Sequence, residues 1–351
     1  MKKLLTVALG LFIAFSLLEV GLRIYHHGAS PGERFDTSSP IRKSRYVSHP
    51  FLPYSGRPSS RFELYNGPER TPEIIVTNAF GFRAHEFPVE KAPNDFFVLA
   101  FGGSTTYGYK AESNAATWPE LLERKLADRY TNRRIRVFNM GVDMATTAFS
   151  VVNLSLIGVH VRPDLVIVYQ GYNDLAALGY STFRSDHSHF YKDIDPMEAS
   201  RGIQLGMPRA LLRSYAIYYA TGALDTYFGV NDLMQTARRP NESPDPDRLR
   251  GIETTLANLR TIEAIARGRG AQALFSTFQF TYESRQPEYQ RFNEALRTFF
   301  RANGMNWVDQ SALIPDEDPT INVDDCHFTP KGRGLVVQNF YDWIVANDLI
   351  R

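Results

Sequence analysis

The chain has 351 residues, of which 43% are hydrophobic and 22% are charged, a balance that is ordinary for a globular protein. The length is sufficient for one catalytic domain with additional segments. The formal net charge at pH 7 is only +1, and the short basic run at 133–136 precedes a predicted strand instead of lying among aromatic residues. Composition therefore argues against nucleic acid as a partner.

The beginning of the chain is apolar after two lysines. Lys2 and Lys3 precede an apolar run over 4–18, a pattern typical of a secretory signal or a signal anchor. At about 1.5 Å per residue, this run with its extension to Leu22 barely spans a bilayer. Because no clean Ala-x-Ala site follows, we expect residues 1–24 to be an uncleaved anchor that holds the catalytic domain outside the cytoplasm. The alternatives are a cleaved signal peptide, which would leave a periplasmic or secreted protein, and a buried N-terminal helix.

Residues 25–94 are rich in proline, glycine, serine and arginine. Turn signals at 50–54 and a hairpin-like signal at 77–83 predict a spacer followed by an ordered lead-in. Arg83 follows a Gly-Phe pair, and we expect it to form a structural salt bridge rather than to bind an acidic ligand.

A strongly apolar strand is predicted over 96–101, and it ends in Gly102-Gly103-Ser104. Six consecutive apolar residues are typical of a buried parallel strand, and two glycines allow a sharp turn at its carboxyl end. Open α/β sheets carry their chemistry at that end. Ser104 would present its hydroxyl and its backbone N–H to a crevice there, although the same pattern alone also fits an ordinary loop with a serine N-cap.

Two further predicted strands end in hydrogen-bond donors. One closes on Asn139-Met140-Gly141, and the other, over 165–169, is followed by Gly-Tyr-Asn173-Asp. A glycine lets a substrate approach a backbone N–H, and an asparagine amide is a neutral donor. Together with the N–H of Ser104, these groups predict a three-donor oxyanion hole.

Near the C-terminus, Asp324 stands three residues before His327, and Thr-Pro follows as a helix start. The carboxylate can reach one imidazole nitrogen, fix the tautomer and stabilise an imidazolium. Taken alone, Asp-x-x-His also fits a simple turn hydrogen bond. Asp325 is the competing carboxylate, and its spacing fits less well. Cys326 is the only cysteine, so it forms no internal disulfide, and we expect it to point away from His327 as a buried small apolar residue.

Four blocks in this order resemble the SGNH (GDSL-type) hydrolases, over about residues 96–343 apart from an insertion. The chain departs from the family signature at Gly103, where the family name has Asp, and at Tyr172, where a small or polar residue is commoner. We expect no cofactor and no metal. The resemblance implies Ser104 as nucleophile, His327 as general acid/base, Asp324 as its orienting carboxylate, and the N–H groups of Ser104 and Gly141 with the Asn173 side chain as the oxyanion hole.

Predicted strands and helices alternate from residue 96 onward, which favours a parallel doubly wound sheet. A capping box at Thr117-Trp118-Pro119-Glu120 opens a helix that runs to about Tyr130. The resemblance implies a three-layer α/β/α sandwich around a five-stranded, flavodoxin-like sheet in residues 95–351. The remaining predicted elements are helices over 145–159, 248–267, 288–302 and 331–346 and strands over 165–169, 273–278 and 305–308.

A long aromatic-rich insertion occupies about 175–247. Its place after the third strand predicts a lid or a substrate wall, with plain packing of the aromatic rings as the alternative. The stretch 186–189, Asp-His-Ser-His, has metal-ligand composition, but its spacing is generic and we expect no metal there. The aromatic residues are Tyr180, Phe183, Phe190, Tyr191, Tyr215, Tyr218, Tyr219, Tyr227 and Phe228.

These features predict a serine esterase that works through an acyl-enzyme on a small-molecule or glycan ester. Location outside the cytoplasm makes O-acetyl groups on cell-surface polysaccharide an attractive substrate hypothesis. The same machinery fits hydrolysis of lipid esters or thioesters and acyl (acetyl) transfer to a glycan hydroxyl. A non-hydrolytic, membrane-tethered glycan-binding factor is a reading from a different class.

Overall fold

The computed structural model describes residues 2–25, 45–47, 49–66, 71–180, 182–191, 214–217, 219–220 and 249–350. The chain divides into two compact units. The first comprises Met1–Ser55 and Tyr191–Glu242, and the second comprises Gly56–Phe190 and Ser243–Arg351. The predicted domain boundaries at residues 24 and 94 stay predictions.

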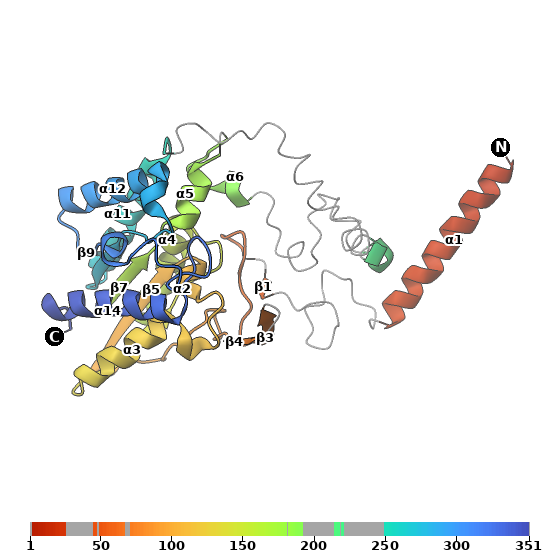
Figure 1. Ribbon diagram of the computed structural model, residues 1–351. Coiled ribbons are helices and arrows are strands. Elements are labelled where there is room, and N and C mark those ends of the chain that lie inside the picture. The colour runs from red at the N-terminus through yellow and green to blue at the C-terminus, as the bar shows by residue number, and fades with distance from the viewer. Residues whose placement is uncertain are drawn as a thin grey trace. The chain divides into compact units, whose positions relative to one another are not determined.

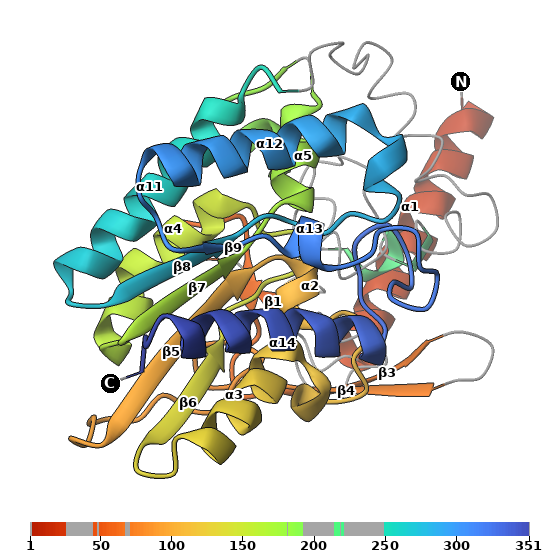
Figure 2. The same ribbon diagram turned by 60° about the vertical axis from the view of Figure 1, so that its left-hand side comes forward.

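The second unit is built on a parallel sheet, part of which is labelled in Figure 1. Its five strands lie in the order β6-β5-β7-β8-β9, and Figure 2 labels each of them. This order is the flavodoxin-like one, so the predicted doubly wound parallel sheet is confirmed. Every residue of β5 and β7 is buried, as expected for strands covered on both faces. The bounds are β5 Asp95–Gly102, β6 Arg134–Asn139, β7 Leu165–Tyr169, β8 Gln272–Ser276 and β9 Trp307–Val308.

Helices cover both faces of this sheet (Figure 2). On one face, α3 (Trp118–Arg129) packs against α14 (Pro330–Ala346); on the other, α4 (Thr147–Leu156) packs against α11 (Ile252–Gly268), with α12 (Pro287–Ala302) beside α11. The three-layer sandwich is therefore confirmed. The shorter elements are α2 Ser104–Tyr107, η1 Asn114–Ala116, η2 Gly158–Val161, α5 Tyr172–Leu178, α6 Ser188–Tyr191, η3 Glu283–Arg285 and α13 Gln310–Leu313.

The predicted capping box at the start of α3 does not form. Thr117 occupies the N-cap position, but its hydroxyl donates a hydrogen bond to Asn114 O at 2.8 Å, and Glu120 contacts His85. The reason is the preceding turn η1. The Thr117 hydroxyl binds the Asn114 carbonyl in that turn and makes no capping hydrogen bond to the backbone N–H groups in the first turn of α3. The helix predicted over 145–159 is likewise divided, because α4 ends at Leu156 and the tighter turn η2 follows.

The lead-in contains an antiparallel pair, β3 (Arg61–Asn66) and β4 (Thr71–Val76). Arg83, just beyond β4, is fully buried and donates to Glu73 at 3.1 Å. It also donates to the main-chain oxygen of Gly108 at 2.7 Å. The predicted structural salt bridge is confirmed, and it ties the lead-in to the loop that follows α2.

The first unit contains α1 (Lys2–Tyr25), of which Leu5–Tyr25 is long and apolar enough to cross a membrane. A signal anchor and a signal peptide both fit this length and composition. Glu19 of this helix accepts hydrogen bonds from Ser214 Oγ at 2.9 Å and from Ala216 N at 3.0 Å. Two short strands, β1 (Tyr46–Val47) and β2 (Ser55–Gly56), form a separate two-stranded sheet.

We expect Arg83→Ala to lower the free energy of unfolding by about 3–5 kcal/mol, because it removes the buried guanidinium that pairs with the buried Glu73 carboxylate. Arg61→Ala is the matched control, since Arg61 and Glu63 form an ion pair with side chains 57% and 50% exposed, and exposed pairs contribute about 0–1 kcal/mol. Urea denaturation of the two variants measures both effects. Equal losses in the two variants would contradict the account of Arg83.

Candidate active site

Ser104 is the first residue of α2 and follows the carboxyl end of β5. A Cβ on Gly102 would lie 2.3 Å from Tyr169 O, and one on Gly103 would lie 2.3 Å from Asn173 Nδ2. Both glycines are therefore required for the chain to pass from strand to helix in this space. The turn fixes the serine at the edge where β5, β6 and β7 end.

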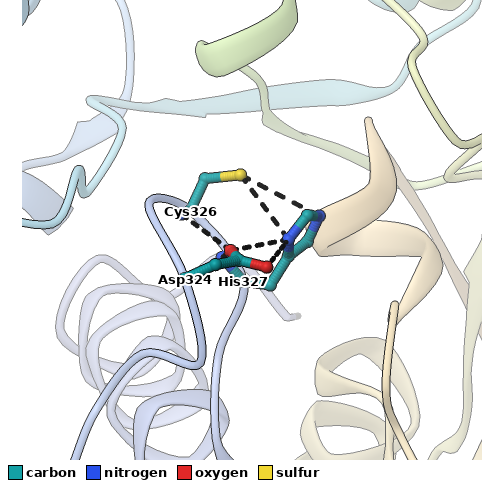
Figure 3. Close-up of side chains that lie close together, drawn as sticks. All are labelled: Asp324, Cys326 and His327. Carbon is teal, nitrogen blue, oxygen red and sulfur yellow. Dashed lines mark hydrogen bonds and ion pairs between the residues drawn. The ribbon is translucent and has the colours of Figure 1, made fainter. Parts of the chain in front are cut away.

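Three side chains form a continuous hydrogen-bonded row at this edge. Ser104 Oγ lies 2.7 Å from His327 Nε2. On the other side of the ring, His327 Nδ1 lies 2.7 and 2.8 Å from the two carboxylate oxygens of Asp324 (Figure 3). The fold thus brings together a serine and a histidine that are 223 positions apart in the sequence.

The loop before α14 positions His327 through the same carboxylate. Asp324 Oδ1 accepts the backbone N–H groups of Cys326 at 3.2 Å and of His327 at 2.9 Å. Asp324 accepts the hydrogen bond from the imidazole, whereas Asp325 contributes its main-chain oxygen as acceptor for Thr281 N at 3.0 Å. The geometry therefore favours Asp324 over Asp325 as the partner of the ring.

The Asp324 carboxyl group is ionised at neutral pH. Its burial raises its pKa, but the hydrogen bonds from the His327 ring and from two backbone N–H groups outweigh burial and lower the pKa to about 2. An ionised acceptor favours the tautomer with hydrogen on Nδ1. His327 Nε2 is then free to accept the Ser104 proton.

Cys326 is buried, as predicted, but the prediction that it points away from His327 is wrong. Its Sγ lies 3.7 Å from Nδ1 and 3.9 Å from Nε2 of the ring (Figure 3). Asp324 draws the backbone into a turn here, so successive side chains do not alternate as they do in extended chain. Burial, together with the nearby carboxylates of Asp324 and Asp325, raises the pKa of the thiol, which therefore stays protonated.

The geometry does not support the predicted role of the Gly141 N–H as an oxyanion donor. This N–H donates to Asn139 Oδ1 at 2.9 Å, inside the protein. A Cβ at Gly141 would lie 2.3 Å from Tyr107 N and 2.8 Å from Thr106 C. The glycine is needed because the loop after β6 packs directly on the backbone of α2. In the sequence, a glycine required for close packing cannot be distinguished from a glycine required as an oxyanion donor.

The other two predicted donors lie close together. Asn173, in the first turn of α5, uses one N–H of its amide to bind Ala145 O at 2.9 Å. Its Nδ2 also lies against Gly103, the residue before Ser104. The hydrogen bonds of α2 begin with Thr106 N, so the N–H of Ser104 has no partner within the helix.

Sequence reasoning missed Tyr109, whose ring packs on His327 with centroids 4.5 Å apart. The chain reverses at Gly108, which has a φ of +92°, and this turn brings Tyr109 back to the site. No pattern in the sequence distinguishes this tyrosine from others. Of the aromatic residues predicted to form a lid, Tyr218, Tyr227 and Phe228 lie outside the described residues.

Two groups of side chains in the described parts of the chain are close enough to share a metal ion. One is the Asp324, Cys326 and His327 group described above. In the other, His85 Nε2 lies 3.2 Å from Glu120, while Glu123 accepts from Arg136 at 2.9 Å. Hydrogen bonds to Glu120 and Glu123 raise the pKa of His85 to about 10. With Arg136 on Glu123, this second group forms an ion-pair network in the structure, and the predicted absence of metal stays a prediction.

We expect Gly141→Ala to destabilise the protein by about 1–3 kcal/mol, the usual cost of overpacking, because the new methyl group would displace the backbone of α2. Gly268→Ala is the control with the opposite sign. Apart from the backbone of its own helix, no heavy atom of the described residues lies within 4 Å of a Cβ at this position, so alanine should add about 0.5–1 kcal/mol. Thermal unfolding distinguishes the two, and a Gly141→Ala protein as stable as the wild type would contradict the packing role.

Comparison with known proteins adds a family match. A model of the GDSL-like lipase/acylhydrolase family matches residues 100–195, the stretch that contains Ser104, Gly141 and Asn173. A search of curated proteins finds no match.

Similar solved structures include TesA, at 16% identity over 72% of this chain and 99% of that chain, with a TM-score of 0.44. The acetylxylan esterase Axe2 from Geobacillus stearothermophilus is 13% identical over 71% of this chain and 94% of its own, with a TM-score of 0.44. A GDSL-like lipase from Bacteroides thetaiotaomicron is 12% identical over 72% and 88%, with a TM-score of 0.39. The family match over residues 100–195 and the flavodoxin-like strand order of the sheet together indicate a hydrolase that acts on ester bonds and is similar to the GDSL-like lipase/acylhydrolase (SGNH) family.

Proposed function

We propose that the protein is a serine esterase that hydrolyses a carboxylic ester through an acyl-enzyme. The observation that carries the proposal is the row from Ser104 Oγ through His327 to Asp324, with 2.7 Å at each junction. A binding protein has no need of a serine hydroxyl, an imidazole and an ionised carboxylate in this arrangement.

The reaction begins when Ser104 Oγ attacks the ester carbonyl carbon and its proton passes to His327 Nε2. Asp324 stabilises the resulting imidazolium through Nδ1. The negative charge on the carbonyl oxygen is met by the N–H of Ser104 and by the second amide hydrogen of Asn173, whose first hydrogen binds Ala145 O. Collapse of the tetrahedral intermediate breaks the carbon–oxygen bond, and His327 protonates the leaving alcohol.

Water completes the cycle. It attacks the acyl carbon on Ser104 and gives one proton to His327. When the second intermediate collapses, His327 returns that proton to Ser104 Oγ, and the carboxylic acid leaves. No metal or redox cofactor enters this sequence of steps.

We further propose that the substrate ester lies outside the cytoplasm, with O-acetyl groups on cell-surface polysaccharide as the leading class. The apolar helix over Leu5–Tyr25 supports this placement by its length and composition. Acyl transfer to a sugar hydroxyl would use the same acyl-enzyme, with the sugar hydroxyl in place of water.

The matched pair Asp324→Asn and Asp325→Asn tests the proposal, since the two carboxylates are adjacent and only one binds the imidazole. With p-nitrophenyl acetate and longer acyl homologues, we expect Asp324→Asn to lower kcat about 10³–10⁴-fold, as the wrong tautomer does in other serine hydrolases. Asp325→Asn should stay within about twofold, and Ser104→Ala should show no turnover.

The controls separate the other readings. Release that persists in Ser104→Ala, or a larger loss in Asp325→Asn than in Asp324→Asn, would contradict the assignment. Ser104-dependent release that requires an added oligosaccharide acceptor would identify an acyltransferase, and hydrolysis with water alone is the result expected here.

A further inference from the structure

A buried polar network lies behind Asn173 and joins α5 to α4. Asp174 is fully buried, and its carboxylate accepts Thr147 N at 3.1 Å and Thr147 Oγ1 at 2.6 Å. Thr255 Oγ1 of α11 donates to the same carboxylate at 3.3 Å. Because Thr147 is the first residue of α4, these bonds fix the start of α4 relative to the start of α5.

The segment 145–147 also orients the Asn173 amide. Asn173 Nδ2 donates to Ala145 O at 2.9 Å, and Gln170 Nε2 donates to the same oxygen. A shift of this segment would rotate the amide whose other hydrogen is directed to the oxyanion. The position of 145–147 therefore sets the geometry of the donor.

His187, from the insertion, contacts the same segment. Its Nδ1 lies 2.8 Å from Thr146 Oγ1, and the residue is 0% exposed. It has a φ of +57°, a conformation rare outside glycine, and its Nε2 is buried without a hydrogen-bond partner among the described residues. Both the positive φ and the unsatisfied Nε2 cost free energy. Costly conformations of this kind persist when the surrounding structure enforces them, and they cluster at functional sites.

We propose that His187 is a positioning residue for the oxyanion donor: it holds Thr146, and through the segment 145–147 it holds the Ala145 carbonyl that orients the Asn173 amide. This inference rests on the proposed function. It gives the insertion a part in the rate of reaction in addition to any role as a lid. Burial lowers the pKa of His187, so the ring that makes this contact is neutral.

The chain offers both a conservative replacement and a matched control. An asparagine amide nitrogen stands about where Nδ1 of histidine stands, and asparagine tolerates positive φ, so His187→Asn keeps the contact. His189 is 5% exposed, and its Nε2 lies 2.8 Å from Ala177 O, nearer the far end of α5. His189→Ala therefore removes a buried histidine whose hydrogen bond to Ala177 lies outside 145–147, while its ring packs edge-on to that of His187 with centroids 6.2 Å apart.

The test compares kcat and KM for p-nitrophenyl acetate in full-length His187→Ala, His187→Asn, His189→Ala and Thr146→Val, together with thermal unfolding. We expect His187→Ala to lower kcat about tenfold with KM within about twofold, since a misplaced oxyanion donor weakens the transition state more than the substrate complex. His187→Asn should recover most of kcat. Thr146→Val should reproduce the loss, and combining it with His187→Ala should add little. His189→Ala should lose a similar amount of stability and keep kcat.

Hydrogen exchange of a peptide covering 143–150 gives a readout that needs no substrate. Faster exchange in His187→Ala than in His189→Ala is expected, and equal exchange would overturn the inference. Equal kcat losses in the two alanine variants, or no recovery in His187→Asn, would overturn it as well. A wild-type protein without Ser104-dependent turnover would instead refute the proposed function, while the exchange result still decides the structural role of His187.

Discussion

The hydrogen bond between Ser104 Oγ and His327 Nε2 joins residues 223 positions apart in the sequence. It forms only if other parts of the second unit bring both side chains to the same edge of the sheet. β5 must end in two glycines so that α2 can begin at the serine. The loop before α14 must turn tightly enough for Asp324 to bind both the ring and the backbone of His327. The parallel sheet satisfies both requirements, because the carboxyl ends of neighbouring strands meet at one edge.

Support for this contact extends well beyond the reacting groups. Thr105 Oγ1, next to the serine, donates to Cys326 O at 3.1 Å and so ties α2 to the histidine loop directly. Arg83 holds the chain just after α2 through Gly108 O. Tyr109 packs on the imidazole. The serine and the histidine are therefore each fixed by at least one contact that takes no part in proton transfer.

The sequence predicts the sheet well because its strands are buried on both faces and read as continuous apolar runs, as in β5 and β7. It also predicts which residues gather at the carboxyl edge. It fails where a local pattern has two physical explanations. Asn-x-Gly at 139–141 is compatible with an oxyanion donor and also with close packing on α2. Only the structure favours packing, because the Gly141 N–H already donates to the Asn139 side chain.

Other failures have the same cause. The sequence around Thr117 matches a capping box, but in the structure its hydroxyl binds an acceptor in η1 instead. The side chain of Cys326 would point away from His327 only if the loop were extended, and the loop is a turn. His187 carries no signal for a link to Thr146 41 residues away, because that contact depends on where the insertion packs. Tertiary contacts of this kind are decided by the assembled fold and not by neighbours in sequence.

The most direct test of the account is to trap the acyl-enzyme. The wild-type protein would be mixed with p-nitrophenyl acetate, quenched in acid at short times and digested, and its peptides analysed by mass spectrometry. The account predicts a transient acetyl group on Ser104 that decays as turnover ends and is absent from His327→Ala. Continued ester hydrolysis with no adduct, or with acetyl on Cys326 instead, would contradict it.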